Sequence, residues 1–327
     1  IPDSPLPSEY GYDEFGAFNC AGEQMPVHED ARNAIAFIER SHREKKPFFI
    51  NLWIHEPHTP FHTVPKYRWR FRELDEPDNI YASVLSHADD RIGEVLDALD
   101  RMQLTDKTLV IFSSDNGPAR AVGRTELKLM HDTATGAGYG IAAARGVTGG
   151  RKGFKAALFE GGICVPFIAR WPGKIAAGKV DKSSMISAVD LLPTFCEIAA
   201  AALPEGYKPD GVSQVDALFG KSHAGRRKPL FWKMQSAWPI RKSKPYHWVS
   251  YAVVHENWKL LTNRDSSYLE LYDIGADPLE QTDLKEEQPD VVRQLTEQIE
   301  TWKKTLTDNP TGDVFSIERS DLNRPER

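Results

Sequence analysis

The amino-acid sequence predicts an α/β fold followed by a small subdomain made of an antiparallel sheet and one helix. In the first part of the chain, short apolar runs alternate with long amphipathic helices, and in the last part short strands precede a final helix. The chain has 327 residues, 40% hydrophobic and 27% charged, a globular composition with room for one large core and a smaller unit.

The first elements are a helix and a strand. Residues 1–27 are rich in Pro, Gly, Ser and Asp without a sustained period, which predicts an irregular lead-in. Residues 30–45 then place apolar side chains at helical spacing and end in a basic turn, which predicts a helix. The apolar run 48–54 that follows predicts a strand buried on both faces.

The clearest helix covers residues 80–102, where apolar side chains recur every three or four positions. Two further β-rich apolar runs lie at 108–114 and 165–171, and residues 191–203 predict a helix with Pro193 in its first turn. Strands that alternate with helices favour βαβ units and a parallel sheet covered by helices on both faces.

The character of the chain changes after residue 225. Three strand-like segments, HWVSYAVV, WKLLT and YLELYDI, are joined by short turns and precede an amphipathic helix that contains Leu295 and Ile299. We therefore predict a larger α/β domain over 28–225, an α+β subdomain over 226–308 and a polar tail over 309–327.

Charge and composition limit the partners. The formal net charge of -6 provides no global basic field, so we expect no nucleic-acid partner, and an anionic ligand must be met by a local cluster of cations. The three cysteines are too few and too scattered for a disulfide framework. No apolar run approaches the ~20 residues that span a bilayer, so we expect no membrane span.

A candidate metal site lies in the segment SSDNGP, residues 113–118. Asp-Gly and Asn-Gly pairs are typical of hairpin turns, but no alternating strand follows Gly117. Asp115 and Asn116 come at the end of a predicted strand, and their side-chain oxygens suit a hard cation such as Ca²⁺ or Mg²⁺. Spacing alone leaves the turn and the metal site as alternatives.

A candidate anion site lies in the glycine-rich segment 149–167. Its cations Arg151, Lys152 and Lys155 could form a solvated face, which is the more common fate of a basic run. The glycines favour a close approach of the backbone, and such a loop can hold a lysine as a fixed charge against a phosphate or sulfate oxygen. Beside these segments, residues 119–147 predict a mobile loop.

A candidate acid follows the predicted strand 48–54. The segment HEPHTPFH contains three histidines, and Pro57 and Pro60 stiffen the backbone around His58. This favours His58 over His55 and His62 as a positioned acid or anion contact.

Several motifs in fixed order resemble one family. They are PFFINLWIHEPHTPF, LVIFSSDNGP, GFKAALFEGGICVPFIARWPG, SAVDLLPTFCEIA and LYDIGADPLEQTDL. Together they resemble the sulfatases of the alkaline-phosphatase superfamily, over roughly residues 30–305. The resemblance implies an alkaline-phosphatase-like mixed sheet flanked by helices, present here in part, with 28–225 as the C-terminal part of the catalytic domain.

The resemblance also implies roles for the candidate residues. Asp115 and Asn116 would be ligands of one divalent cation, calcium rather than magnesium. Lys155 would contact the sulfate oxygens and steady the leaving oxygen, and His58 would help to bind sulfate and protonate the departing alkoxide. Metal and lysine would stabilise the charge on the transferring group while an acid serves the leaving group.

The nucleophile of the family is a formylglycine made from Cys or Ser in a C/S-x-P-x-R motif, and these 327 residues do not contain the motif. Cys164 begins a similar string, but Ile168 stands where arginine is required, so we predict an ordinary buried thiol. We expect a fragment of a longer enzyme, with the formylglycine in the missing N-terminal part. Alone, the chain should bind calcium weakly and turn over nothing.

The predicted function is sulfuric ester hydrolysis, with a sulfated small molecule or glycan as partner. Two alternatives stay open: a phosphodiesterase or phosphonate hydrolase of the same superfamily, and a non-catalytic binding protein on a sulfatase scaffold. The resemblance implies a periplasmic, extracellular or lysosomal protein, and the sequence does not indicate an oligomeric state.

Overall fold

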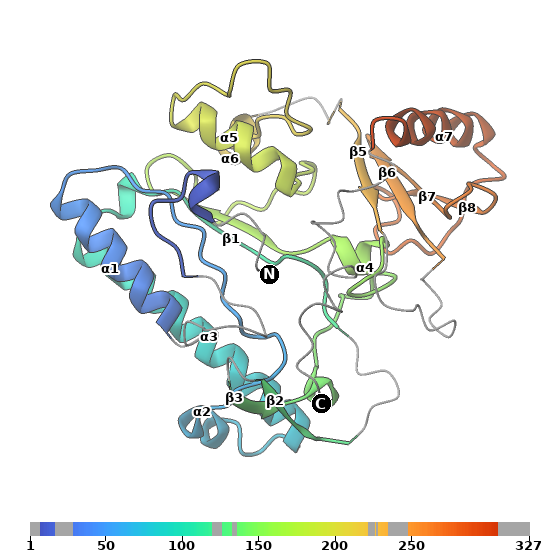
Figure 1. Cartoon of the computed structure of the whole chain (residues 1–327). Coiled ribbons are helices and arrows are strands. Elements are labelled where there is room, and N and C mark those ends of the chain that lie inside the picture. The colour runs from blue at the N-terminus through green and yellow to red at the C-terminus, as the bar shows by residue number, and fades with distance from the viewer. Residues whose placement is uncertain are drawn as a thin grey trace. The chain divides into compact units, whose positions relative to one another are not determined.

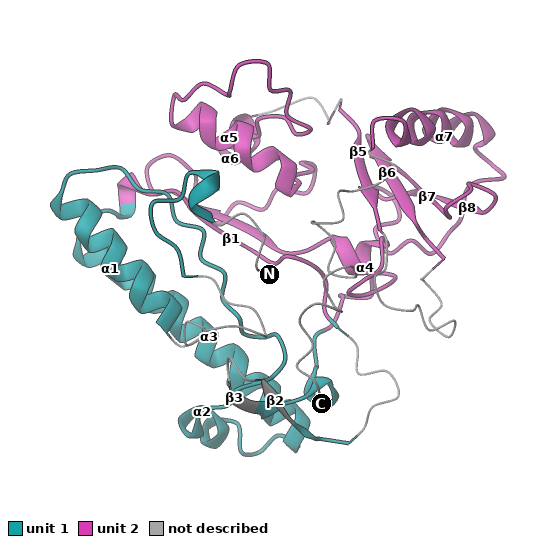
Figure 2. Cartoon of the chain, viewed as in Figure 1, with its two compact units in different colours: residues 1–105, 119–146, 309–327 teal, residues 106–118, 147–308 magenta. Residues whose placement is uncertain are grey.

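The computed structural model describes residues 7–16, 29–119, 126–132, 136–221, 226, 228–234 and 248–306. The chain divides into two compact units (Figure 2). Unit 1 comprises residues 1–105, 119–146 and 309–327, and unit 2 comprises residues 106–118 and 147–308. The α/β class and the C-terminal antiparallel sheet with its helix are confirmed. The predicted domain boundaries stay predictions, and the tail lies outside the described residues.

Unit 1 is built on two long helices that lie side by side, α1 (Asp30–Arg43) and α3 (Glu76–Arg101) (Figure 1). Both confirm helices predicted from apolar spacing. At the start of α3 the Asp75 carboxylate accepts a hydrogen bond of 2.9 Å from the backbone N–H of Asp78, which caps the helix. Among the described helices, none is both long and apolar enough to cross a membrane.

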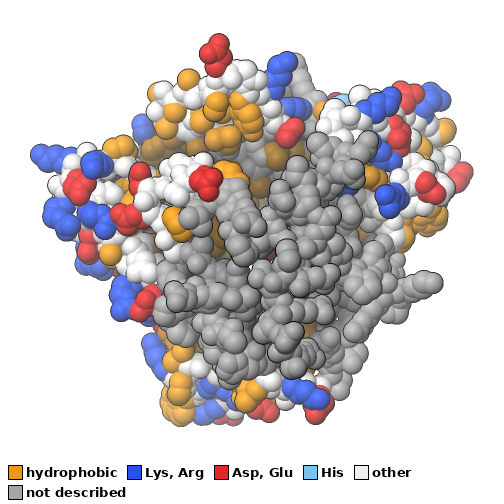
Figure 3. Space-filling model, viewed as in Figure 1, with side chains coloured by type: hydrophobic (Ala, Val, Ile, Leu, Met, Phe, Trp, Pro, Cys, Tyr) orange, Lys and Arg blue, Asp and Glu red, His pale blue; other side chains and the backbone are white. Residues whose placement is uncertain are grey.

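The last turn of α1 is basic, as the sequence predicts. It carries Arg40, His42 and Arg43, and Lys and Arg side chains gather over this end of the helix in the space-filling view (Figure 3). Cations at a helix C-terminus stabilise it against the helix dipole. This cluster therefore has a structural explanation.

The remaining elements of unit 1 are the helix α2 (Pro65–Arg70), the hairpin strands β2 (Leu129–Asp132) and β3 (Gly136–Tyr139), and 3-10 helices at Pro7–Tyr10 and Ile141–Ala143. The prediction of a loop over 119–147 is wrong where the hairpin lies, because β2 and β3 pair antiparallel there. Phe61 exchanges backbone hydrogen bonds of 2.8 and 3.0 Å with Tyr139, so the segment after His58 is anchored to β3.

The predicted buried strand at 48–54 is wrong. These residues form no strand, and the side chains of Phe49 and Trp53 are 56% and 80% exposed. An apolar run becomes a strand only where a neighbour completes its hydrogen bonds, and in the described part of the chain none of the strands pairs with 48–54.

In unit 2 the strands β1 (Val110–Ser113) and β4 (Phe167–Arg170) form a two-stranded sheet. Their predicted positions are confirmed, but the predicted parallel pairing is wrong for them. They run antiparallel, with Val110 opposite Arg170. Apolar periodicity locates a strand but does not reveal the path of the connection that sets its direction.

The C-terminal sheet has the order β5-β6-β7-β8, all antiparallel. Its strands are β5 (Leu230–Lys233), β6 (Tyr251–His255), β7 (Trp258–Thr262) and β8 (Leu269–Asp273), and it is followed by α7 (Pro289–Lys303). Shorter helices of unit 2 are α4 (Glu160–Ile163), α5 (Leu191–Ile198) and α6 (Val215–Leu218), with 3-10 helices at Thr105–Lys107 and Ala188–Asp190.

Both faces of this sheet are covered. Leu260 and Leu271 pack with Leu295 and Ile299 of α7 in one core. On the opposite face, residues 157–159 pack with Ala252, Leu261 and Tyr272 in a second core. Successive side chains of a strand point to opposite faces, so neighbouring leucines of β7 serve different cores. The glycine-rich segment that carries Lys155 is thereby part of the packing of this sheet.

Candidate active site

The loop that follows β1 carries Asp115 and Asn116. The Asn116 backbone N–H donates a 2.8 Å hydrogen bond to Oδ1 of Asp115, and Nδ2 of Asn116 donates to the Gly117 carbonyl at 2.9 Å. The Ser114 hydroxyl donates to the Asn116 carbonyl at 3.0 Å. These bonds use the nitrogens of Asn116 and Oδ1 of Asp115, so Oδ1 of Asn116 and Oδ2 of the exposed Asp115 carboxylate are left as oxygen ligands for a cation.

This loop lies directly against the backbone of Gly161 and Gly162. The N–H of Gly117 donates to the Gly162 carbonyl at 2.9 Å. A Cβ atom at Gly117 would come within 1.9 Å of the Gly161 oxygen, so no larger residue fits without movement of the backbone. The glycines that the sequence places in both segments are therefore explained by close approach of two main chains.

Lys155 belongs to the same arrangement. Its backbone N–H donates to the Pro118 carbonyl at 2.9 Å, which places the Lys155 backbone beside the loop of Asp115 and Asn116. Its side chain is half-buried, and among the described residues its ammonium has no ion pair.

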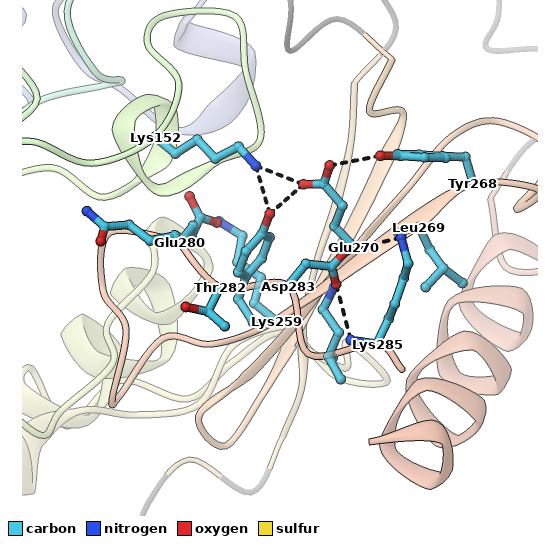
Figure 4. Close-up of polar contacts among 12 residues, drawn as sticks. Lys152, Lys259, Tyr268, Leu269, Glu270, Glu280, Thr282, Asp283 and Lys285 are labelled. Carbon is cyan, nitrogen blue, oxygen red and sulfur yellow. Dashed lines mark hydrogen bonds and ion pairs between the residues drawn. The ribbon is translucent and has the colours of Figure 1, made fainter. Parts of the chain in front are cut away.

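The neighbouring cation Lys152 has a different role. Its Nζ donates to Glu270 at 2.9 Å (Figure 4). It also donates to the Tyr272 hydroxyl at 2.7 Å. Burial and then the Glu270 carboxylate raise the pKa of Tyr272, so its hydroxyl stays protonated. Lys152 therefore fixes the loop to β8, and of these two lysines only Lys155 is left for an anion.

His58 lies in unit 1, in an exposed turn. Its backbone N–H donates to the His55 carbonyl at 2.8 Å, and its Nδ1 lies 2.7 Å from the Thr59 carbonyl. A carbonyl oxygen only accepts, so this contact assigns a hydrogen to Nδ1 and leaves Nε2 for other partners. The convergence of His58 with Asp115, Asn116 and Lys155 stays a prediction.

The side-chain oxygens of Asp115 and Asn116 are the type of ligand that a hard divalent cation prefers, but two oxygens are too few to hold the ion. Ca²⁺ takes ~6–8 oxygen ligands, of which Asp115 and Asn116 would supply two. In the described ranges, no group of three or more His, Cys, Asp and Glu side chains could hold a metal ion. The loop after β1 is thus suited to contribute to a cation site that needs further ligands.

Cys164 is exposed, which corrects the prediction of a buried thiol. It follows the short helix α4 and precedes β4, outside the apolar interior.

Sequence reasoning missed one buried charge near this site. Lys259 of β7 is fully buried, and its Nζ lies 2.7 Å from Glu160 and 2.8 Å from Glu280. The available signal was a lysine in the middle of the otherwise apolar strand WKLLT. A buried lysine needs paired carboxylates, and neither could be assigned from spacing.

Comparison with known proteins identifies the class. The family model described as "Sulfatase" matches residues 3–201, and the model described as "N-sulphoglucosamine sulphohydrolase, C-terminal" matches residues 151–305. The chain belongs to the sulfatase family.

Individual relatives support this assignment. An N-acetylgalactosamine-6-O-sulfatase of Bacteroides thetaiotaomicron is 29% identical over 267 residues, which cover 80% of this chain and 48% of the relative. Arylsulfatase G of Mus musculus is 30% identical over 197 residues, which cover 60% of this chain and 34% of the relative. The chain therefore spans at most about half the length of these two curated relatives.

A solved structure shows the shared fold. The crystal structure of Ps i-CgsB aligns with a TM-score of 0.72 at 24% identity, covering 92% of this chain and 59% of that chain.

Proposed function

We propose that this chain is the C-terminal part of a sulfuric ester hydrolase that acts on a sulfated carbohydrate. The observation that carries the proposal is the hydrogen-bonded pair of loops in unit 2, which sets the Lys155 backbone beside Asp115 and Asn116. Membership of the sulfatase family supports the reaction. The relative whose name specifies N-acetylgalactosamine-6-O-sulfate chemistry supports the substrate class.

In this proposal each residue acts on a different part of the ester. Asp115 and Asn116 would give two oxygens to a calcium ion, which when bound would stabilise negative charge on the sulfate oxygens. Lys155 binds a sulfate oxygen as a point charge and steadies the leaving oxygen. The imidazolium form of His58 would donate its Nε2 proton to the departing alkoxide and become the neutral Nδ1–H ring, while the Nδ1–H bond to Thr59 fixes the ring. The formylglycine nucleophile would come from residues outside this sequence.

The test is sulfate release by the complete gene product, measured on 6-O-sulfated amino sugars and glycosaminoglycan fragments beside a phosphate diester. We expect sulfate release, and we expect Lys155→Ala to lower kcat/KM by about 10²–10³-fold, the usual effect of removing one oxyanion-stabilising group. Lys179→Ala, at an exposed position, is the matched control and should leave kcat/KM unchanged.

Other outcomes would replace the proposal. Turnover of the phosphate diester without sulfate release would assign the protein to the phosphodiesterases or phosphonate hydrolases. Binding of sulfated glycans without any turnover would indicate a binding protein on a sulfatase scaffold. We further propose, from the family alone, a periplasmic, extracellular or lysosomal location.

A further inference from the structure

A buried charge cluster lies behind the loop that carries Lys155. Lys259 is 0% exposed and Glu280 is 2% exposed, and both lie beside Glu160. Lysine and glutamate are almost never fully buried unless they are paired. Glu160 is held twice: its carboxylate accepts from Lys259 at 2.7 Å, and its backbone N–H donates to Glu280 at 2.7 Å.

Lys259 lies on a face of the sheet that also carries an apolar core. Leu261, two positions along the same strand, packs with Ala157, Leu158 and Phe159 on this face of the sheet. Replacement of a whole buried ion pair by well-packed hydrophobic residues is often neutral or stabilising, so packing alone does not require a Lys–Glu pair here, although removal of Lys259 alone leaves buried carboxylates unpaired and destabilises the fold. The contacts of the Lys259 ammonium instead support a role in holding Glu160 in position.

The contacts continue from Glu160 to the candidate site. Gly161, the next residue, donates its N–H to the Lys152 carbonyl at 2.7 Å. Gly162 accepts from the N–H of Gly117, two residues after Asp115. A Cβ at Gly161 would lie 2.5 Å from the Gly153 oxygen and one at Gly162 would lie 2.1 Å from the Ala157 oxygen. Because these backbones touch without intervening side chains, a displacement of Glu160 is passed on directly.

We propose that Lys259 is a positioning residue, which holds Glu160 so that the segment 160–162 fixes the Asp115–Asn116 loop and the backbone of Lys155. Glu280 supports this role, because its carboxylate accepts the hydrogen bond of the Glu160 backbone N–H and so orients the backbone there. The expected effect of Lys259 on catalysis rests on the proposed function. Its structural part concerns only contacts within unit 2.

Three variants of the complete protein separate positioning from general stability. Lys259→Met removes the charge and keeps the length of the side chain. Glu160→Ala cuts the link to the loop while Lys259 keeps Glu280 as its counter-ion, so this variant should fold even if the first does not. Arg226→Met is the control, because it removes another buried cation of unit 2. Arg226 pairs with Asp190 at 2.7 Å and donates to the Lys228 carbonyl, both outside the glycine-rich segment.

The first readout is amide hydrogen exchange under native conditions. In Lys259→Met and Glu160→Ala we expect exchange at Gly117, Lys155 and Gly161 to rise about tenfold or more, with the amides of α7 unchanged. In Arg226→Met, exchange at these three amides should stay as in the wild type. Unchanged exchange in both Lys259→Met and Glu160→Ala would overturn the proposal.

The second readout is sulfate release. Since a 1 Å misplacement can cost about 10²-fold, we expect a fall in kcat of about 10–100-fold, larger than any change in KM, in the two test variants and not in the control. An equal loss in Arg226→Met at matched thermal stability would show a merely structural role. If the wild type releases no sulfate, the proposed function fails while hydrogen exchange still decides whether Lys259 positions the loop.

Discussion

Substitution of Gly117 by alanine is the sharpest test of the packing beneath the candidate site. The new Cβ would lie 1.9 Å from the Gly161 oxygen and 2.9 Å from its carbonyl carbon, distances that real Cβ atoms essentially never show. One of the two backbones must therefore move by about 1 Å, and neither has a flexible side chain that could yield. Overpacking of this kind costs about 1–3 kcal/mol, and loss of the Gly117–Gly162 hydrogen bond adds about 1 kcal/mol.

We therefore expect Gly117→Ala to lower the free energy of unfolding of unit 2 by about 2–4 kcal/mol, measured by urea denaturation with hydrogen exchange as a local probe. Gly93→Ala is the matched control, because no atom beyond its chain neighbours and the adjacent backbone of α3 lies within 4 Å of its Cβ position. In a helix interior this change should stabilise by up to about 1 kcal/mol. Equal stability of Gly117→Ala and the wild type would refute the close approach of the two loops.

Three further predictions concern the cation, a buried acid and the C-terminal core. Asp115→Ala should weaken Ca²⁺ binding by the complete protein at least about tenfold by calorimetry, because a charged oxygen ligand is lost, and unchanged affinity would remove Asp115 from the site. Burial raises the pKa of Glu280 above its ordinary 4.5, so the folded state holds this proton more tightly and the stabilisation is lost as pH rises through the raised value. Glu280→Gln should therefore gain stability relative to the wild type as pH rises above the ordinary 4.5 and through the raised pKa of Glu280, and a difference between the two unfolding curves that does not change with pH would contradict this. Ile299→Ala should lower the free energy of unfolding of unit 2 by about 2–5 kcal/mol in denaturant titrations, since Ile299 is fully buried in the core between α7 and the sheet, whereas the half-exposed Val291 should tolerate alanine better.

The helices could be predicted from the sequence because their signals are local. The apolar spacing of α1, α3 and α7 repeats over several turns, and the basic last turn of α1 lies within the same segment. The four-residue strand β5 was not predicted, because its side chains Leu230–Lys233 show no alternation long enough to recognise. Residues 48–54 show the opposite error, since their composition is β-rich and they form no strand.

The site was predictable in part. Family motifs indicated Asp115, Asn116 and Lys155, and the structure adds the hydrogen bonds that join their loops. The carboxylate partners of Lys152 and Lys259 could not be predicted, because Glu270 and Glu280 are brought near by the pairing and turn of β7 and β8. Lys152 lies 118 positions before Glu270 and Lys259 lies 21 positions before Glu280, and contacts over such separations leave no local pattern.

The second core has a practical consequence for recombining this protein with its relatives. Residues 157–159 pack on the face of the C-terminal sheet opposite α7. A chimera joined near residue 225 would therefore pack the native residues 157–159 against a sheet from another protein. A crossover near residue 147 would transfer residues 157–159 and the sheet together. The segment to be exchanged must therefore include residues 157–159 in addition to the four strands and the helix of the C-terminal sheet.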